Sequence, residues 1–335
     1  MAFRRFRWTL GLVAAVALVG AACGDGSASD GGGGTTLTGD LFISGSSTVE
    51  PVTGLIAELF NEENPGVPID VEGPGTGDGF ELFCNGETDI SDASRPIQEE
   101  EAQACSANGV EYVELEVAID GMAVLTSPGN TAVTCLTFAD LYALLGPESQ
   151  GFENWSDANA LAAEVGGTGG YPNARLDITA PGEESGTYDS FIELALEGIA
   201  EERGQEAVVR PDYQSSANDN VIIEGIAGAP ASLGWVGYAF YEQNQDVVRA
   251  IEVDGGDGCV APSPETIADG TYPLARSLFI YVNKDKAAEK TALTAFVDLY
   301  VTETGLVDSV QQVGYVPLPP ERIEQTRSAW ENGKP

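Results

Sequence analysis

The sequence predicts an α/β fold with mostly parallel sheets flanked by helices. Along the 335 residues, short apolar strand patterns alternate with amphipathic helix patterns, which is typical of parallel sheets with helical connections. This length allows two domains with full cores, and no internal repeat is visible. Two of the strand patterns run into turns rich in serine and threonine. Ligands of parallel sheets bind at such carboxyl ends, so we expect a ligand site there.

The predicted elements begin with a strand at 41–43. Apolar residues from Val52 to Phe60 then recur with helical spacing, until the sequence Asn64-Pro65-Gly66 ends the helix. A strand at 67–71 leads through a glycine-rich turn into a short helix. Further strands are predicted at 111–117, 122–125, 176–179 and 278–282, and further helices at 136–145, 187–202, 287–301 and 322–330.

The chain is strongly acidic, with 53 aspartate and glutamate residues, 15 lysine and arginine residues and a formal net charge of −38. Nucleic acids and anionic membrane surfaces demand basic patches, so both are excluded as partners. An anionic ligand would have to be held by local dipoles and hydrogen bonds against this field. Solubility, or adaptation to salt or low pH, explains the acidity. The alternative is calcium binding, but no Asp-x-Asp-x-Asp-Gly loop supports it.

The N-terminus has the pattern of an export signal. Arg4, Arg5 and Arg7 precede an apolar run at 8–22. This run is short for a membrane-spanning helix, because a helix needs about 20 apolar residues to cross a bilayer. We therefore expect residues 1–22 to be a signal peptide.

The end of this segment predicts a lipid anchor. The sequence Val19-Gly20-Ala21-Ala22-Cys23 resembles a bacterial lipobox, although leucine is usual where Gly20 stands. We expect Cys23 to carry lipid such as palmitate, and residues 23–39 to be a flexible tether on the extracytoplasmic face of the cell membrane. The alternative is an ordinary signal peptide followed by a disordered start.

Four cysteines remain after Cys23, an even number that suits an oxidising compartment. They allow three disulfide pairings. We favour Cys84–Cys105, which are close in sequence, together with Cys135–Cys259. A zinc site is the weaker alternative, because the spacings are wrong and the chain has no histidine. We expect neither a metal nor another cofactor.

Two hydroxyl-rich turns have the chemistry of an oxyanion site. In 42–49 and again in 177–191, a strand pattern runs into small hydroxyl residues that open a helix. The N-terminus of a helix leaves free N–H groups and a partial positive charge, so it binds anions readily. Ser185 and Thr187 add hydroxyl donors, and Gly186 lets a ligand approach the backbone. We expect the two turns to clamp an oxyanion between two lobes, although each turn alone could be a simple helix cap.

Four loops in one order carry a family resemblance. They are Gly45-Ser46-Ser47-Thr48, Gly75-Thr76-Gly77, Ile90-Ser91-Asp92-Ala93-Ser94-Arg95 and Ser185-Gly186-Thr187. Together with the lipobox and with the later sequences Tyr272-Pro273-Leu274-Ala275-Arg276 and Val313-Gly314-Tyr315-Val316-Pro317, they resemble the phosphate-binding lipoprotein of the bacterial Pst ABC transporter, the PstS family. The likeness spans about residues 40–320.

The resemblance implies a two-lobed, type II periplasmic binding protein with a hinge of two crossover strands near 126 and 275. Lobe one would comprise roughly 40–126 plus 275–335, and lobe two 127–274. The protein would be a monomeric solute-binding protein that delivers inorganic phosphate to an ABC permease. The resemblance places these residues on the phosphate: Ser47, Thr48, Thr76, Asp92, Arg95, Ser185, Gly186 and Thr187.

One position departs from the family pattern. Many members carry an arginine four residues before the serine of Ser-Gly-Thr, where this chain has Pro181. Arg95 is the expected replacement, because a guanidinium binds an oxyanion with two parallel hydrogen bonds. Asp92 is expected to select phosphate, which keeps a proton near neutral pH, over sulfate, which does not. Taken in isolation, Asp92 and Arg95 are better explained as a surface ion pair, and the order of the four loops favours binding instead.

Two alternatives to phosphate binding are an enzyme and a binding protein for another oxyanion. An enzyme such as a phosphatase could not use Ser-His-Asp, Cys-His or His-ligated metal chemistry, because no histidine exists. Only four lysines remain for a Ser-Lys mechanism, none near a hydroxyl turn, so we expect no enzyme. A binding protein for sulfate or molybdate should avoid a buried carboxylate such as Asp92.

Overall fold

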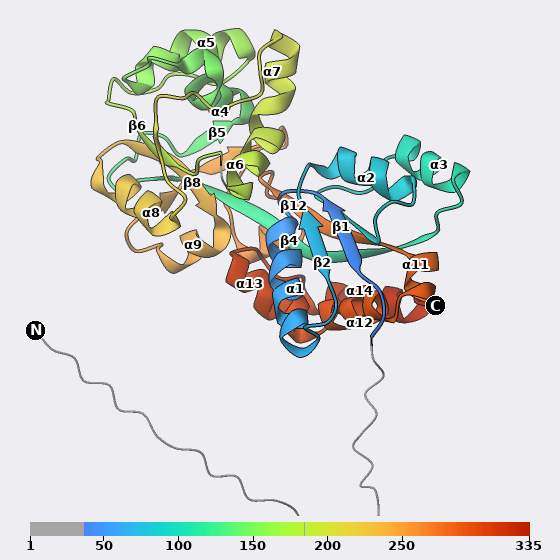
Figure 1. The fold of residues 1–335 in the computed structure, drawn as a ribbon. Helices are drawn as coiled ribbons and strands as arrows, with labels where there is room; N and C mark the ends of the chain where they lie inside the picture. Colours follow the sequence, from blue (N-terminus) through green and yellow to red (C-terminus); the bar gives the residue numbers. More distant parts are fainter. Residues whose placement is uncertain (1–36, 184) are drawn as a thin grey trace, which may run out of the picture. The chain divides into compact units, whose positions relative to one another are not determined.

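A sheet of nine strands passes through the structure, a computed structural model that describes residues 37–183 and 185–335 (Figure 1). Its strands are β1 (Leu41–Gly45), β2 (Ile69–Glu72), β3 (Ile90–Ala93), β4 (Tyr112–Thr126), β6 (Asp177–Ala180), β7 (Gln214–Ser215), β8 (Ser232–Gly237), β9 (Arg249–Ala250) and β12 (Ala275–Asn283). A smaller sheet contains β5 (Cys135–Thr137), β10 (Glu252–Asp254) and β11 (Cys259–Val260).

The α-helices of the described residues are α1 (Glu50–Glu63), α2 (Thr76–Cys84), α3 (Glu99–Ala107), α4 (Phe138–Leu145), α5 (Asn159–Val165), α6 (Gly186–Phe191), α7 (Glu197–Arg203), α8 (Asp219–Gly228), α9 (Tyr238–Gln243), α10 (Pro264–Ala268), α11 (Lys284–Glu289), α12 (Thr291–Tyr300), α13 (Val310–Val313) and α14 (Pro320–Gly333). Short 3-10 turns lie at Pro147–Ser149 and Trp155–Ala158, and π-helical turns at Ile192–Leu196 and Thr304–Ser309. The first π-helical turn joins α6 directly to α7.

The order of strands in the large sheet is β2-β1-β3-β12-β4-β8-β6-β7. Strands β1, β2 and β3 are parallel, and so are β6, β7 and β8. Between these two groups, β12 and β4 pair antiparallel with each other and with their outer neighbours. The α/β fold with parallel strands and flanking helices agrees with the predicted fold class.

Strand β4 connects the two groups of strands (Figure 1). Tyr112 to Gly121 lie opposite β12, whereas Met122 to Leu125 pair with β8. The separate strands predicted at 111–117 and 122–125 are therefore one strand of 15 residues. The intervening Asp120 does not end it, because this charge lies opposite Arg276 of β12. The change of partner comes ahead of the boundary expected at 126.

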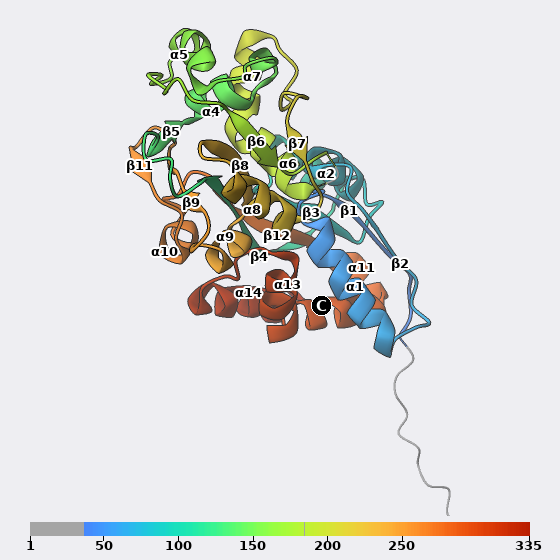
Figure 2. The ribbon, with the colours of Figure 1, turned by 90° about the vertical axis from the view of Figure 1, so that its left-hand side faces the viewer.

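Helices cover both faces of the β1 group (Figures 1 and 2). Along β12, Leu278, Ile280 and Val282 pack in one apolar cluster with residues of α1, α12 and α14, whereas Phe279 and Tyr281 pack with α2 and α3. This alternation follows from the pleat, which turns successive side chains to opposite faces. Each buried side chain of this size stabilises the fold by about 1.5–3 kcal/mol.

Two large apolar clusters divide the described chain. One draws its buried residues from 41–118 and 278–330, and the other from 119–274 together with Leu318. Trp155 and Trp235 are fully buried in the second cluster, as expected for core aromatics, and Trp235 stacks on Phe191. We call the two parts the first half and the second half. The exact lobe boundaries, 40–126 plus 275–335 and 127–274, stay predictions.

Both favoured disulfides are present. Cys84–Cys105 joins α2 to α3 with 4.1 Å between the Cα atoms, and Cys135–Cys259 joins β5 to β11 across 6.0 Å. Bridges of this kind stabilise a fold by about 2–4 kcal/mol. They hold the edges of the two halves rather than the junction between them.

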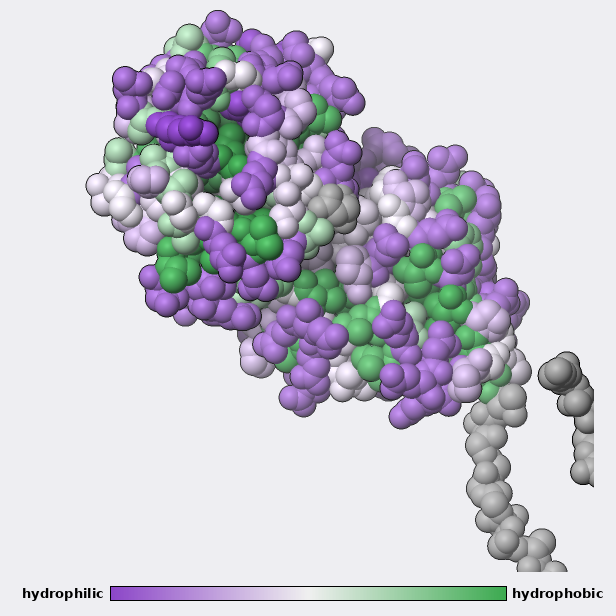
Figure 3. Space-filling model, turned by 60° about the vertical axis from the view of Figure 1, so that its left-hand side comes forward, coloured by the Kyte–Doolittle hydropathy of each residue, from purple (hydrophilic) through white to green (hydrophobic). Residues whose placement is uncertain are grey.

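The surface is polar, as the composition requires. Hydrophilic residues cover most of the face drawn in Figure 3, and only Val221 and Val247 are exposed among the large hydrophobic residues of the described chain. No helix within 37–183 or 185–335 is long and apolar enough to cross a membrane. The predicted signal peptide and the predicted lipid site Cys23 lie outside the described residues.

Candidate anion-binding site

Three loops of the first half meet at the carboxyl ends of β1 and β3. The Gly75 N–H donates to the Gly45 carbonyl at 2.8 Å, and the Ser46 N–H donates to the Asp92 carbonyl at 2.8 Å. Gly45 has a φ of +152°, and a Cβ there would lie 2.0 Å from the Asp92 carbonyl oxygen. Only glycine fits this close approach. The separate motifs of the sequence therefore form one surface.

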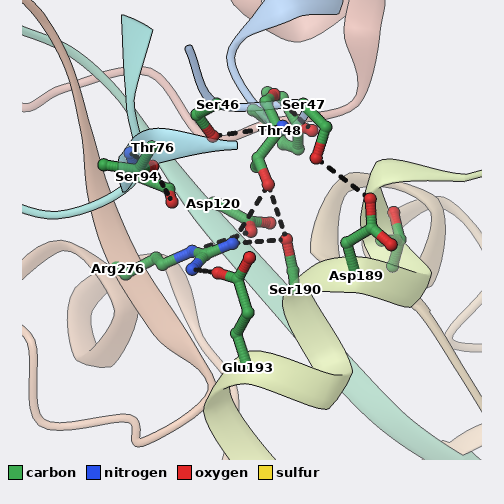
Figure 4. Close-up of polar contacts among 12 residues, drawn as sticks. Ser46, Ser47, Thr48, Thr76, Ser94, Asp120, Asp189, Ser190, Glu193 and Arg276 are labelled. Carbon is green, nitrogen blue, oxygen red and sulfur yellow. Dashed lines mark hydrogen bonds and ion pairs between the residues drawn. The ribbon is translucent and has the colours of Figure 1, made fainter. Parts of the chain in front are cut away.

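Ser47 and Thr48 turn their hydroxyls toward the second half (Figure 4). Ser47 Oγ donates to Asp189 Oδ2 at 3.0 Å, and Thr48 Oγ1 lies 3.2 Å from Ser190 Oγ. Helix α1 begins after Val49 without a side-chain cap, so capping does not use either hydroxyl. The Tyr315 hydroxyl donates to the Thr48 carbonyl at 2.9 Å and fixes the loop.

Thr76 is held by Ser94. Their hydroxyl oxygens are 3.0 Å apart, and the Ser94 N–H donates to Thr76 Oγ1 at 3.1 Å. Ser94 belongs to the quoted third motif but was not among the predicted ligands. Ser94 follows the end of β3 directly, and its hydroxyl side chain at the carboxyl end of a strand is the signal that could have found it.

The fourth loop lies against the first. A Cβ on Gly186 would be 3.5 Å from the Ser47 carbonyl oxygen and 3.6 Å from Thr48 Cα, so the two loops are in contact. Ser185 caps α6 by accepting from the Thr187 N–H at 3.3 Å. A cavity of about 610 Å³ opens beside this contact, with Ser47, Ser185, Gly186 and Asp189 in its lining.

Arg276 is the buried cation of this junction, and it was not among the predicted ligands. Its Nη2 atom donates to Thr48 Oγ1 at 3.0 Å and to Ser190 Oγ at 2.9 Å, and Nη1 donates to Glu193 (Figure 4). Its side chain is 13% exposed. The sequence at 272–276, which is part of the family resemblance, was the signal that could have indicated this residue. The pairing of Arg276 with Asp120 across two strands could not be read from the sequence.

Carboxylates surround this arginine. Asp120 is fully buried with Oδ2 3.6 Å from Arg276 Nε, and burial raises its pKa while Arg276 offsets part of the rise. Burial also raises the pKa of Asp189, which the Ser47 hydroxyl partly offsets. The hydroxyls and the guanidinium that suit an oxyanion thus contact carboxylates in this structure.

Asp92 lies on β3 beneath α1. It is fully buried, and neither carboxylate oxygen has a hydrogen bond of good geometry. Burial raises its pKa to about 7, the nearby Thr53 hydroxyl lowers it and Glu50 raises it. A buried acceptor without a donor is unusual in a folded protein and points to a proton or a ligand. The role of Asp92 toward phosphate stays a prediction.

Arg95 forms a bidentate ion pair. Nη1 and Nη2 donate to the two carboxylate oxygens of Glu101 at 2.8 and 2.7 Å, and the guanidinium lies 5.6 Å from the centre of the Phe80 ring. This pairing raises the pKa of Arg95. No hydrogen bond to the Gly45–Thr48 loop or to Ser185–Thr187 is described for it. Its expected role as the replacement cation stays a prediction.

No group of three or more His, Cys, Asp or Glu residues within 37–183 and 185–335 has a geometry that could hold a metal ion. The donors at the junction are hydroxyls, backbone N–H groups and one guanidinium, which suit an anion rather than a cation.

Comparison with known proteins identifies a family. A family model described as a PBP superfamily domain matches residues 30–304. Protein SphX of Synechocystis sp. is 39% identical over 295 residues, 88% of this chain and 83% of its own. The phosphate-binding protein PstS of Staphylococcus saprophyticus is 31% identical, covering 94% of this chain and 91% of its own.

Solved structures agree with these relatives. The crystal structure of a possible phosphate binding protein from Planctomyces limnophilus superposes with a TM-score of 0.78 at 32% identity, covering 89% of this chain and 99% of its own. An ABC-type phosphate transport receptor from Vibrio cholerae superposes with a TM-score of 0.57 at 25% identity, covering 83% and 100%.

Proposed function

This chain belongs to the PBP superfamily and, within it, to the family of PstS phosphate-binding proteins, and we propose that it captures inorganic phosphate outside the cytoplasm for an ABC-type phosphate permease. The family is one of solute-binding proteins. The proposal is therefore one of binding and release, and catalysis forms no part of it.

One observation carries the proposal. The loop of Ser47 and Thr48 contacts the loop of Ser185 to Thr187, although the two are more than a hundred residues apart and belong to different halves. Both loops open helices and so present the partial positive charge of a helix N-terminus, although the Thr48, Val49 and Thr187 N–H groups already donate within their own turns. Phosphate offers many acceptor oxygens, and this junction offers hydroxyl and N–H donors from both sides.

The proposed ligand set combines donors, a cation and a selective carboxylate. It comprises Ser47, Thr48, Thr76, Asp92, Arg95, Ser185, Gly186 and Thr187. Asp92 would accept a hydrogen bond from the proton that phosphate keeps. Against sulfate, an ionised Asp92 adds only repulsion, about 4 kcal/mol at roughly 4 Å and an effective dielectric constant near 20. Another oxyanion is the alternative ligand, and this buried carboxylate speaks against it.

The cellular context is proposed on the family and on the N-terminal sequence. A lipid on Cys23 and the tether at 23–39 would hold a monomeric domain at the outer face of the cell membrane. Closure of the two halves on phosphate would let the permease distinguish the loaded from the empty protein. The acidic surface repels an anion at a distance, so local donors at the junction must supply the affinity.

Titration calorimetry with phosphate and with sulfate at pH 8, above the pKa of about 7 to which burial raises Asp92, tests the function. We expect wild-type protein to bind phosphate far more tightly than sulfate, and the Asp92→Asn variant to lose part of this discrimination because the repulsive charge is gone while the donors remain. Wild-type protein that binds no phosphate would overturn the proposal. Turnover of a generic phosphate ester would instead favour the enzyme. An unchanged phosphate-to-sulfate ratio in Asp92→Asn would refute only the role of Asp92.

A further inference from the structure

Arg276 is the point at which both halves and both connecting strands meet. It lies on β12 directly opposite Asp120 of β4, and it contacts Thr48 of the first half and Ser190 and Glu193 of the second. Within the described residues, Arg276 is the cation that donates to a predicted hydroxyl loop, through Thr48. Arg95, the other candidate, is bound to Glu101. Its guanidinium still has the planar, forked donor geometry that tetrahedral oxyanions match.

The two carboxylates on this guanidinium differ in burial. Asp120 is fully buried on the central strand β4, with its Oδ2 3.6 Å from Nε. Glu193 is 43% exposed on the π-helical turn, and one rotation of its flexible side chain returns it to solvent. The ion pair joins a largely buried arginine to this half-exposed carboxylate, so Glu193 can leave without becoming a buried charge that lacks a partner.

We propose that Arg276 receives the oxyanion, that Asp120 positions it, and that Glu193 is an internal competitor which holds the guanidinium and yields it to the anion. The proposal rests on the proposed function, whose site it deepens. In the same way, Asp189 accepts a hydrogen bond from Ser47. Two carboxylates of one helical segment, Asp189 and Glu193, therefore hold donors that the anion would use.

A competitor of this kind contributes to selectivity. An incoming anion must replace a carboxylate on the same nitrogen atoms, since two anions beside one guanidinium repel each other. A tetrahedral oxyanion offers two oxygens to the fork and can make this exchange. A halide has a single contact point and gains less, which would keep chloride out of the site.

Calorimetric titration of inorganic phosphate at pH 8 tests the proposal with paired variants. Glu193→Gln should bind phosphate about three- to tenfold more tightly than wild type, because the competing charge is lost and the fold is kept. Glu197→Gln is the matched control, with the same charge change on the next turn. Glu197 senses the charge of Arg276 without a hydrogen bond or ion pair to it, so its removal should change phosphate affinity by no more than about twofold. Arg276→Gln should bind at least about thirtyfold more weakly, and Asp120→Asn should also bind more weakly.

Thermal unfolding of each variant without phosphate separates competition from a structural role. Glu193→Gln should gain affinity while its midpoint stays equal to or below that of wild type. If Arg276→Gln does not fold, Arg276→Lys serves instead, and a loss of affinity is again expected because the fork is missing. Affinity in Glu193→Gln that equals the Glu197→Gln value, or falls below wild type, would overturn the proposal. If wild type binds no phosphate, the proposed function itself fails.

Discussion

Asp92 is the residue whose environment departs most from that of an ordinary aspartate. It is fully buried, its oxygens have no well-formed hydrogen bond, and its pKa is raised to about 7 by burial. The carboxyl group therefore favours its neutral form in the folded protein up to neutral pH. The raised pKa contributes to the free energy of unfolding. This contribution is fully present below the unfolded-state pKa of about 4, and it is lost as the pH rises to the folded-state pKa of about 7.

Replacement of Asp92 by Asn should therefore make stability less sensitive to pH. A rise of about three pKa units corresponds to a stability change on the order of 4 kcal/mol, spread between about pH 4 and pH 7. Denaturant unfolding at pH 5 and at pH 8 measures it. The unfolding free energy of Asp92→Asn minus that of wild type should be clearly larger at pH 8 than at pH 5. A difference between the two proteins that does not change with pH would mean that Asp92 is ionised or solvated in the fold.

Arg95 and Arg276 can be separated by substitution. If Arg95 is the replacement cation, Arg95→Ala should lower phosphate affinity by at least about 2 kcal/mol, as expected when a buried charge pair loses a partner. The structure pairs Arg95 with Glu101, so Glu101→Gln is the matched control that leaves the arginine in place. Calorimetry checks both variants. A wild-type affinity in Arg95→Ala would assign this residue to the ion pair alone.

Among the elements, those with strong local patterns were predictable. The helix expected at 52–60 is α1, and the helix at 322–330 lies within α14, because their apolar spacing coincides with their buried faces. The helix expected at 287–301 is instead divided into α11 and α12 by the extended backbone of Lys290. Lysine carries no breaking signal, so a local pattern could not reveal this division.

The site was predictable where a motif lies on one loop. Ser47, Thr48 and Gly186 come together as the two hydroxyl turns suggested. Arg276 was missed as a ligand because its place depends on the antiparallel register of β12 with β4, a contact between residues 156 positions apart in sequence. Such long-range pairing leaves no periodic trace in the sequence.

At the level of elements, the disulfide between α2 and α3 carries a prediction. These helices stand over β3 and β12 with a small apolar cluster of their own, and the ion pair of Glu101 with Arg95 also holds α3 to the first half. The Cys84→Ala, Cys105→Ala double variant should lose about 2–4 kcal/mol of unfolding free energy. Denaturant unfolding measures the loss, and wild-type stability would show that packing alone holds α3. Phosphate affinity serves as the control and should be retained, because neither cysteine lies at the anion site.

At the scale of the whole molecule, the donors are divided between two halves. Ser47, Thr48 and Thr76 belong to the first, and Ser185 to Thr187 belong to the second. Strands β4 and β12 of the large sheet pair with each other at the junction, and Arg276 and Asp120 lie opposite each other on them. An ion that uses both donor sets should favour the closed arrangement, since no open arrangement lets both sets reach it.

Small-angle X-ray scattering with and without phosphate tests this central claim most directly. We predict that saturating phosphate lowers the radius of gyration, because the ion bridges the halves, and that the same concentration of sulfate leaves it unchanged. Calorimetry on the same sample establishes saturation. An unchanged radius of gyration in phosphate-saturated protein would contradict the clamp and would mean that phosphate binds in a preformed pocket.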